Sequence, residues 1–118
     1  MPETLEISVV GMLYRVTPGT LEKMRDALPL RCELEREPEN LHDENAVKVM
    51  VTERPWAKPH GFFHVGFLSR EVAAEFASRM DVGKFPFTEA WLMEIDEANG
   101  TGVLLLKKVR KAAKKKSG

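Results

Sequence analysis

The sequence has little of several features that would tie it to a compartment or a reaction. Its 118 residues include one cysteine, Cys32, so neither an internal disulfide nor a cysteine-rich metal site can form, which fits a reducing compartment. No apolar run approaches the roughly 20 residues that cross a bilayer. The first residues are acidic, whereas a signal peptide begins basic and then turns apolar. We therefore expect a protein of the cytoplasm with no membrane segment.

Catalytic and metal-binding motifs are also missing. The eight glycines form no G-x-G-x-x-G or G-x-x-x-x-G-K turn, and no serine stands in a nucleophile elbow. His60 and His64 are four residues apart, but Pro59 and Gly61 argue against the helix that would bring them together as metal ligands. The run His42-Asp43-Glu44 has no second histidine or cysteine nearby. We expect no enzymatic activity, no cofactor and no metal.

Acidic residues are absent after Glu97, and this absence divides the chain. Its 18 Lys and Arg balance 18 Asp and Glu, but residues 1–106 carry 11 − 18 = −7 and residues 107–118 carry +7. The seven cations of this basic tail are Lys107, Lys108, Arg110, Lys111, Lys114, Lys115 and Lys116. Such an arm suits a phosphate backbone, and a solvated terminus that only aids solubility is the alternative.

What is present indicates one small, mainly β domain. Hydrophobic periodicity and turn signals predict six strands, at residues 5–14, 30–35, 46–52, 64–68, 85–96 and 101–109. They predict two helices, at residues 20–28 and 69–80. Asn99-Gly100 is a strong hairpin signal, and Cys32 alternates with leucines as a small core residue. Many short strands with one good helix favour an α+β fold built on a small, partly open barrel over residues 1–108, followed by a disordered basic tail, 109–118.

The loop between the second and third predicted strands carries the most specific pattern. Residues 37–49, Glu-Pro-Glu-Asn-Leu-His-Asp-Glu-Asn-Ala-Val-Lys-Val, resemble the central motif of the HIRAN family, E/D-P-x-N-x-x-D-x-N-A-V/I-x-V. Residues 9–15, 65–70 and 72–77 resemble three further family stretches, in the same order. The match covers roughly residues 5–108 and is to the small stand-alone bacterial or phage members. It implies an oligonucleotide-binding-like (OB-like) barrel without the motor of helicase relatives.

The resemblance implies a DNA-binding site, because the best-understood relatives capture the 3′ end of single-stranded DNA. Asp43 stands where the family's carboxylate accepts a hydrogen bond from the terminal 3′-hydroxyl, and it would repel a 3′-phosphate. The alternative is that Asp43 only caps the turn at Asn45. Asn40 either contacts sugar or phosphate or holds the loop, and we expect Asn45 to be structural.

Aromatic and basic positions complete the implied site. Tyr14 matches an aromatic that stacks on a base, and a position at the edge of the core is its alternative. Arg15 stands where helicase relatives carry a second aromatic, and it can contact phosphate. His42 replaces an aromatic and can stack, whereas Phe67 replaces a polar residue. Arg70 keeps the expected cation at the start of the second helix, with a merely solvated role as the alternative.

These matches lead to one expected function and one alternative. We expect a DNA-binding module for single-stranded or frayed ends that prefers a 3′-hydroxyl, in DNA repair, replication or recombination. The alternative is a protein-interaction adaptor, for example for a DNA-processing protein, since the acidic body repels phosphate. The connection at residues 53–64 is longer than in the helicase domains, and Trp56 and Phe62 within it are expected to pack on the barrel rather than stack on bases.

Overall fold

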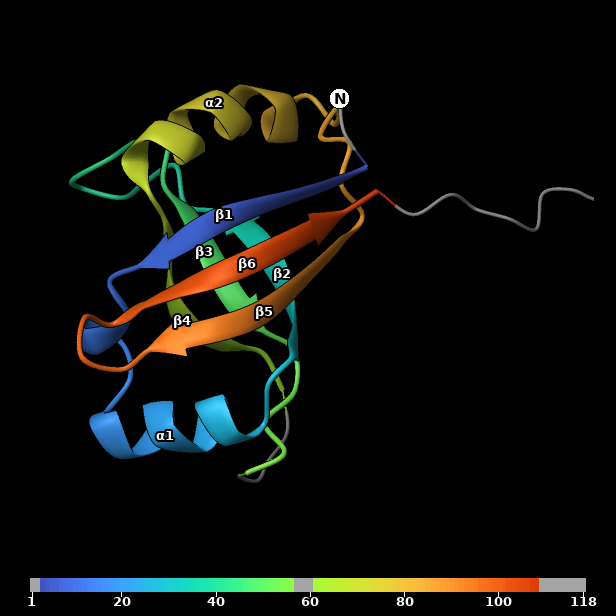
Figure 1. The fold of residues 1–118 in the computed structure, drawn as a ribbon. Coiled ribbons are helices and arrows are strands. Elements are labelled where there is room, and N and C mark those ends of the chain that lie inside the picture. Colours follow the sequence, from blue (N-terminus) through green and yellow to red (C-terminus); the bar gives the residue numbers. More distant parts are fainter. Residues whose placement is uncertain (1–2, 57–60, 109–118) are drawn as a thin grey trace, which may run out of the picture.

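Six antiparallel strands form a closed ring in the computed structural model, which describes residues 3–56 and 61–108 (Figure 1). The strands are β1 (Thr4–Val10), β2 (Leu30–Arg36), β3 (Val47–Val51), β4 (Phe63–Leu68), β5 (Glu89–Asp96) and β6 (Thr101–Lys107). The helices are α1 (Pro18–Asp26), α2 (Arg70–Asp81) and the short 3-10 helix η1 (Met12–Tyr14). The mainly β fold with two α-helices and six strands is confirmed. The barrel closes, however, where the sequence suggested a partly open one.

The strands follow one another around the ring in the order β1-β4-β3-β2-β5-β6, and their pairings differ in length. Strand β6 pairs along almost its whole length with β1 and with β5. Strand β2 follows β3 from Cys32 to Arg36. In contrast, β1 meets β4 over only two residue pairs, and β2 meets β5 over three. The ring therefore has two short seams, β1–β4 and β2–β5.

Alternate residues of the strands fill the barrel, and the helices cover its two ends (Figure 1). Cys32 is 2% exposed among leucines and valines, as predicted, and burial raises the pKa of its thiol to about 12. Helix α2 begins at the N-cap Ser69 and buries Phe76 in the core. Among the described residues, no helix is long and apolar enough to span a membrane.

Two predicted strands are shorter than expected. The first ends at Val10 because Gly11 adopts a left-handed φ of 74°, which turns the chain into η1. Residues 11–14 are therefore not strand, and Tyr14 projects from η1 with 91% of its surface exposed. Strand β5 begins at Glu89 rather than at Phe85. Residues 84–88 instead have no regular secondary structure, and Phe85 packs edge-to-face on Phe76 and Phe87.

The remaining turn predictions fit the structure, and the long connection has a mixed character. Strands β5 and β6 join through a turn at 97–100, as the hairpin signal predicted. Trp56 is half-buried against the core, whereas Phe62 is 60% exposed. Packing on the barrel is therefore right for Trp56 and wrong for Phe62. Residues 57–60 of this connection lie outside the described residues.

Candidate nucleic-acid interface

The loop from Glu37 to Ala46 is held in one shape by hydrogen bonds from its own polar residues. The Asn40 side chain donates from Nδ2 to Glu37 Oε1 at 2.7 Å. Its Oδ1 accepts from the backbone amides of His42 at 2.8 Å and Asp43 at 3.0 Å. Both ends of the Asn40 amide are thus used within the loop. The observed bonds favour the loop-holding role of Asn40 over direct contact with a ligand.

Two arginines attach this loop to the rest of the fold. Arg36, at the end of β2, donates to the carbonyls of Ala46 at 2.8 Å and Glu44 at 3.1 Å. The same guanidinium forms a bidentate ion pair with Asp81, with Nε–Oδ1 at 2.9 Å and Nη2–Oδ2 at 3.2 Å. Arg36 therefore fixes the back of the loop to the end of α2.

Arg70 makes the second attachment, to another carbonyl of the loop. It is the first residue of α2, and its Nη2 donates to the His42 carbonyl at 2.6 Å. In Figure 1 the loop accordingly lies beside the start of α2. The guanidinium is exposed and has further N–H donors, so Arg70 can hold the loop and still meet an anion.

A cavity of about 230 Å³ opens between this loop and the β1–β4 seam. Five predicted site residues line it, namely Asn40, His42, Asp43, Phe67 and Arg70. Val10, Ala46 and Leu68 complete the lining with apolar surface. Its volume is below the ~300–1,000 Å³ of pockets that enclose a whole small molecule. A cavity of this size suits one end of a longer ligand, with apolar contact on one side and polar groups on the other.

Asp43 lines this cavity, and its two carboxylate oxygens differ in their hydrogen bonds. Its Oδ1 accepts from the Asn45 amide at 2.9 Å, which is the turn-capping bond considered as its alternative role. Within the described part of the chain, Oδ2 accepts no hydrogen bond. The two roles are compatible, because capping occupies a single oxygen of the carboxylate.

Tyr14 and Arg15 lie outside this cavity. They border a separate hollow with Leu13 and Val16. The 91% exposure of Tyr14 contradicts an edge position in the core and leaves the ring open to stack on a ligand.

A histidine that the sequence analysis did not assign to the DNA-binding site, His64, contacts the cavity residue Phe67. The His64 ring packs edge-to-face on Phe67 with centroids 4.8 Å apart, and its Nε2 lies 2.9 Å from the Gly66 carbonyl oxygen. Burial, and then the nearby charge of Arg15, lower the pKa of His64. His64 therefore contacts a cavity residue, Phe67, and lies close enough to Arg15 to be affected by its charge.

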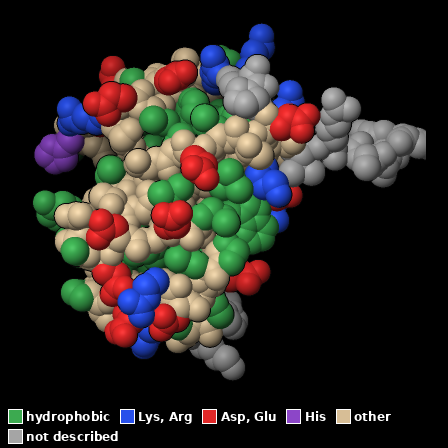
Figure 2. Space-filling model, viewed as in Figure 1, with side chains coloured by type: hydrophobic (Ala, Val, Ile, Leu, Met, Phe, Trp, Pro, Cys, Tyr) green, Lys and Arg blue, Asp and Glu red, His purple; other side chains and the backbone are tan. Residues whose placement is uncertain are grey.

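The described part of the basic tail starts away from this loop. Lys107 ends β6, and the Lys108 amide donates to the Glu3 carbonyl at 2.8 Å. In Figure 1 this end of β6 lies across the barrel from the loop. The other predicted tail cations, Arg110, Lys111, Lys114, Lys115 and Lys116, lie outside the described residues. Figure 2 shows acidic side chains spread over the face formed by β1, β5 and β6.

Comparisons with known proteins agree with this architecture. A family model described as the HIRAN domain matches residues 2–108. The chain belongs to the HIRAN family. The solved HIRAN domain of human HLTF is similar to this HIRAN domain, with a TM-score of 0.59 and 24% identity over 87% of this chain and 72% of that chain. A solved protein from Lactobacillus plantarum has a TM-score of 0.60 and 25% identity, over 88% of this chain and 92% of that one. No curated protein matches this HIRAN domain.

Proposed function

We propose that this HIRAN domain is a non-catalytic DNA-binding module that captures the 3′ end of single-stranded or frayed DNA and prefers a free 3′-hydroxyl. The observation that carries the proposal is the cavity beside Asp43, which joins an available carboxylate oxygen to apolar walls. Family membership supports binding of nucleic acid. We assign the module to DNA repair, replication or recombination in the bacterial cytoplasm.

The chemistry of Asp43 gives the end preference. A 3′-hydroxyl can donate a hydrogen bond to the Oδ2 atom, whereas a 3′-phosphate brings only acceptors and negative charge to the same place. Apolar contact from Val10 and Leu68 fits the carbon face of a terminal sugar or base. Arg70 stands at the rim, where the preceding phosphate would meet a cation.

The surface beyond the cavity supplies contacts that do not depend on base sequence. Phe67 and His42 line the cavity and Tyr14 is exposed outside it, and all three rings can stack on bases at about 1–3 kcal/mol each. Arg15 is exposed outside the cavity and can meet a second phosphate.

Fluorescence anisotropy with oligonucleotides labelled on an internal base tests the end preference directly. One sequence is compared with a 3′-hydroxyl, with a 3′-phosphate and as a closed circle. Asp43→Asn keeps an oxygen for the Asn45 amide but loses the charge, so we expect affinity for the hydroxyl end to fall about tenfold and the preference to disappear. Glu44→Gln is the matched control, since it removes the same charge from an exposed neighbour. Equal binding of the wild type to all three oligonucleotides would contradict the proposal.

The basic tail adds attraction that salt should screen. Truncation after Lys108 keeps β6 and its bond to Glu3 but removes five cations, Arg110, Lys111 and three lysines at 114–116. For single strands each phosphate contact contributes about 0.7 to the slope of log K against log salt, so the slope should become shallower by up to about 3.5. Anisotropy titrations at several salt concentrations measure this slope. An unchanged slope would identify the tail as a solvated terminus only.

A further inference from the structure

At the second short seam, between β2 and β5, one strand edge has no partner strand among residues 3–56 and 61–108. The two strands pair at Leu30, Arg31 and Cys32 of β2, and the pairing then stops. Strand β2 nevertheless continues beside β3 as far as Arg36. Its edge from Glu33 onward therefore faces residues 85–88, which have no regular secondary structure and are not paired with it.

The direction of the backbone groups shows which residues this edge offers. The Arg31 carbonyl accepts from the Thr52 amide at 3.0 Å, and the Glu37 amide donates to the Ala46 carbonyl at 3.0 Å, so odd-numbered residues of β2 bond toward β3. The N–H and C=O of Leu34 consequently point to the seam. Across it, the Thr88 amide turns the other way and donates to the Lys107 carbonyl at 2.9 Å. The Leu34 backbone groups are thus placed to pair with an added strand.

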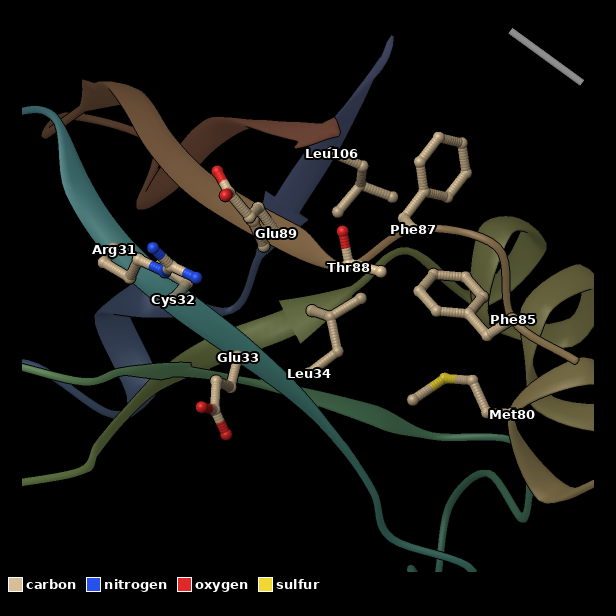
Figure 3. Close-up of a pocket in the computed structure, with 11 residues that line it drawn as sticks. Arg31, Cys32, Glu33, Leu34, Met80, Phe85, Phe87, Thr88, Glu89 and Leu106 are labelled. Atoms are coloured by element: carbon tan, nitrogen blue, oxygen red, sulfur yellow. The ribbon is translucent and has the colours of Figure 1, made fainter. Parts of the chain in front are cut away.

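A cavity of about 240 Å³ lies along this edge, and its two halves differ in chemistry (Figure 3). Figure 3 shows Leu34, Met80, Phe85, Phe87 and Leu106 on one half. Arg31, Glu33 and Glu89 lie on the other half, nearer the point where the strands separate. One apolar side chain can enter the first half while its neighbours in the same peptide meet the charged rim.

The charged rim favours a cation. Because Cys32 pairs with Ala90, the next cross-strand position would place Glu33 opposite Glu89, two like charges that oppose continued pairing. The Arg31 guanidinium lies over the Trp91 ring at 5.4 Å, and Glu89 accepts from the Trp91 indole N–H at 3.0 Å. A lysine or arginine from outside would be attracted by both carboxylates of the seam.

We propose that this β2 edge binds an extended peptide segment of a partner protein in which an apolar residue is flanked by lysine or arginine. The segment adds as a strand, its backbone pairs with Leu34, and its apolar side chain enters the cavity. Successive side chains of a strand point to opposite faces, so the flanking residues lie outside the barrel, opposite Glu33 and Glu35. This edge faces Met80, near the end of α2, whereas the cavity proposed to bind DNA lies at Arg70, the start of α2. A peptide and a DNA end can therefore bind at the same time.

The test uses two displayed libraries of peptides about eight residues long, a length sufficient for one strand. In one library a central Leu, Ile, Val or Phe is flanked by Lys or Arg, and in the other by Asp or Glu, with the remaining positions randomised. Peptides selected on the full-length chain are titrated into the ¹⁵N-labelled protein. We expect enrichment of the basic library by about tenfold and amide shifts centred on Leu34. No binder, or binders that shift other regions only, would overturn the proposal.

Charge variants test whether the selected peptides recognise the two carboxylates of the rim or only the overall negative charge of the domain. The double variant Glu33→Gln/Glu89→Gln should weaken the selected basic peptides about tenfold, while Glu6→Gln/Glu75→Gln, which removes two exposed charges elsewhere, should leave them unchanged. Equal effects of the two variants would overturn the rim assignment. A shift of the Leu34 amide on removing residues 109–118, or on raising the protein concentration, would identify the chain's own tail or a second copy as the occupant instead. None of these experiments contains DNA, so their outcomes do not depend on whether the proposed DNA binding is correct.

Discussion

The two short seams of the barrel carry two different kinds of cavity. At β1–β4 the ring is closed by only two residue pairs, and a polar loop fixed by Asn40 and Arg36 stands over the gap. At β2–β5 the strands separate at Glu33 and Glu89, and the gap is apolar on one side and open along a strand edge. The first seam presents preset side-chain groups, and the second presents a backbone that is ready to pair. In this barrel, candidate binding surfaces occur where the strand pairing is incomplete.

The largest effect is expected at Gly66 of β4, where the backbone of β1 lies close by. A Cβ atom on Gly66 would lie 2.8 Å from the Val10 carbonyl oxygen and 2.9 Å from the Val9 Cγ1. A backbone oxygen cannot move aside cheaply, so Gly66→Ala should force the β1–β4 seam apart and destabilise the fold by about 2 kcal/mol. Urea denaturation measures the loss, and the melting temperature should fall by about 8 °C. Oligonucleotide binding should weaken with it.

Gly19→Ala is the control for this substitution. Gly19 lies in the first turn of α1, and a Cβ there would have no atom within 4 Å. Alanine should leave stability unchanged or raise it by up to about 1 kcal/mol, because it favours the helix. Equal stability of the two variants would mean that the β1–β4 seam tolerates widening. The β1–β4 seam would then not differ from the β2–β5 seam in being fixed in place.

The next largest effect is expected on oligonucleotide affinity, through the shape of the loop from Glu37 to Ala46. Arg36→Ala removes the donors to the Ala46 and Glu44 carbonyls and leaves Asp81 without its bidentate partner. We expect affinity for a 3′-hydroxyl oligonucleotide to fall about tenfold although Arg36 does not line the cavity, because the loop loses its fixed shape. Arg36→Lys should be intermediate, since lysine keeps the charge but not the fork.

Arg25→Ala is the matched control for this loop variant. Arg25 is also ion-paired, to Asp26 and Glu97, but it lies on α1. It should leave oligonucleotide affinity unchanged in the same anisotropy assay. Unaltered binding by Arg36→Ala would show that the loop keeps its shape without this anchor.

The sequence predicted most of the strands and the functional loop, but not which of their residues come together in space. Period-two alternation placed Cys32 correctly, since each side chain of a strand must choose one face. The central motif located Asn40 and Asp43, yet the division of labour between them depends on hydrogen bonds that spacing does not reveal. The shared cavity with Phe67 and Arg70 also depends on ring closure between distant strands.

Two features lacked any local signal. Arg36 has the sequence context of an ordinary exposed strand residue, and its role arises only because α2 ends beside it at Asp81. The strand predicted from Phe85 fails because that residue packs on Phe76 instead of pairing with β2, so tertiary contact overrides its aromatic strand propensity.

The smallest expected effect is a pH dependence of the free energy of unfolding, which arises from His64 beside the β1–β4 seam. Burial, and then Arg15, lower the folded-state pKa of His64 below its ordinary value of about 6.5. Between the two pKa values the unfolded chain binds a proton that the folded chain does not, so the free energy of unfolding falls as the pH drops through this window.

His64→Gln can keep contact with Gly66 and Phe67 but cannot titrate. Urea denaturation at pH 7.5 and 5 should therefore show a smaller loss on acidification for His64→Gln than for the wild type, while His42→Gln, altered on the exposed loop, should behave as the wild type. Identical losses in all three would mean that protonation of His64 is not coupled to the packing of Phe67 at this seam.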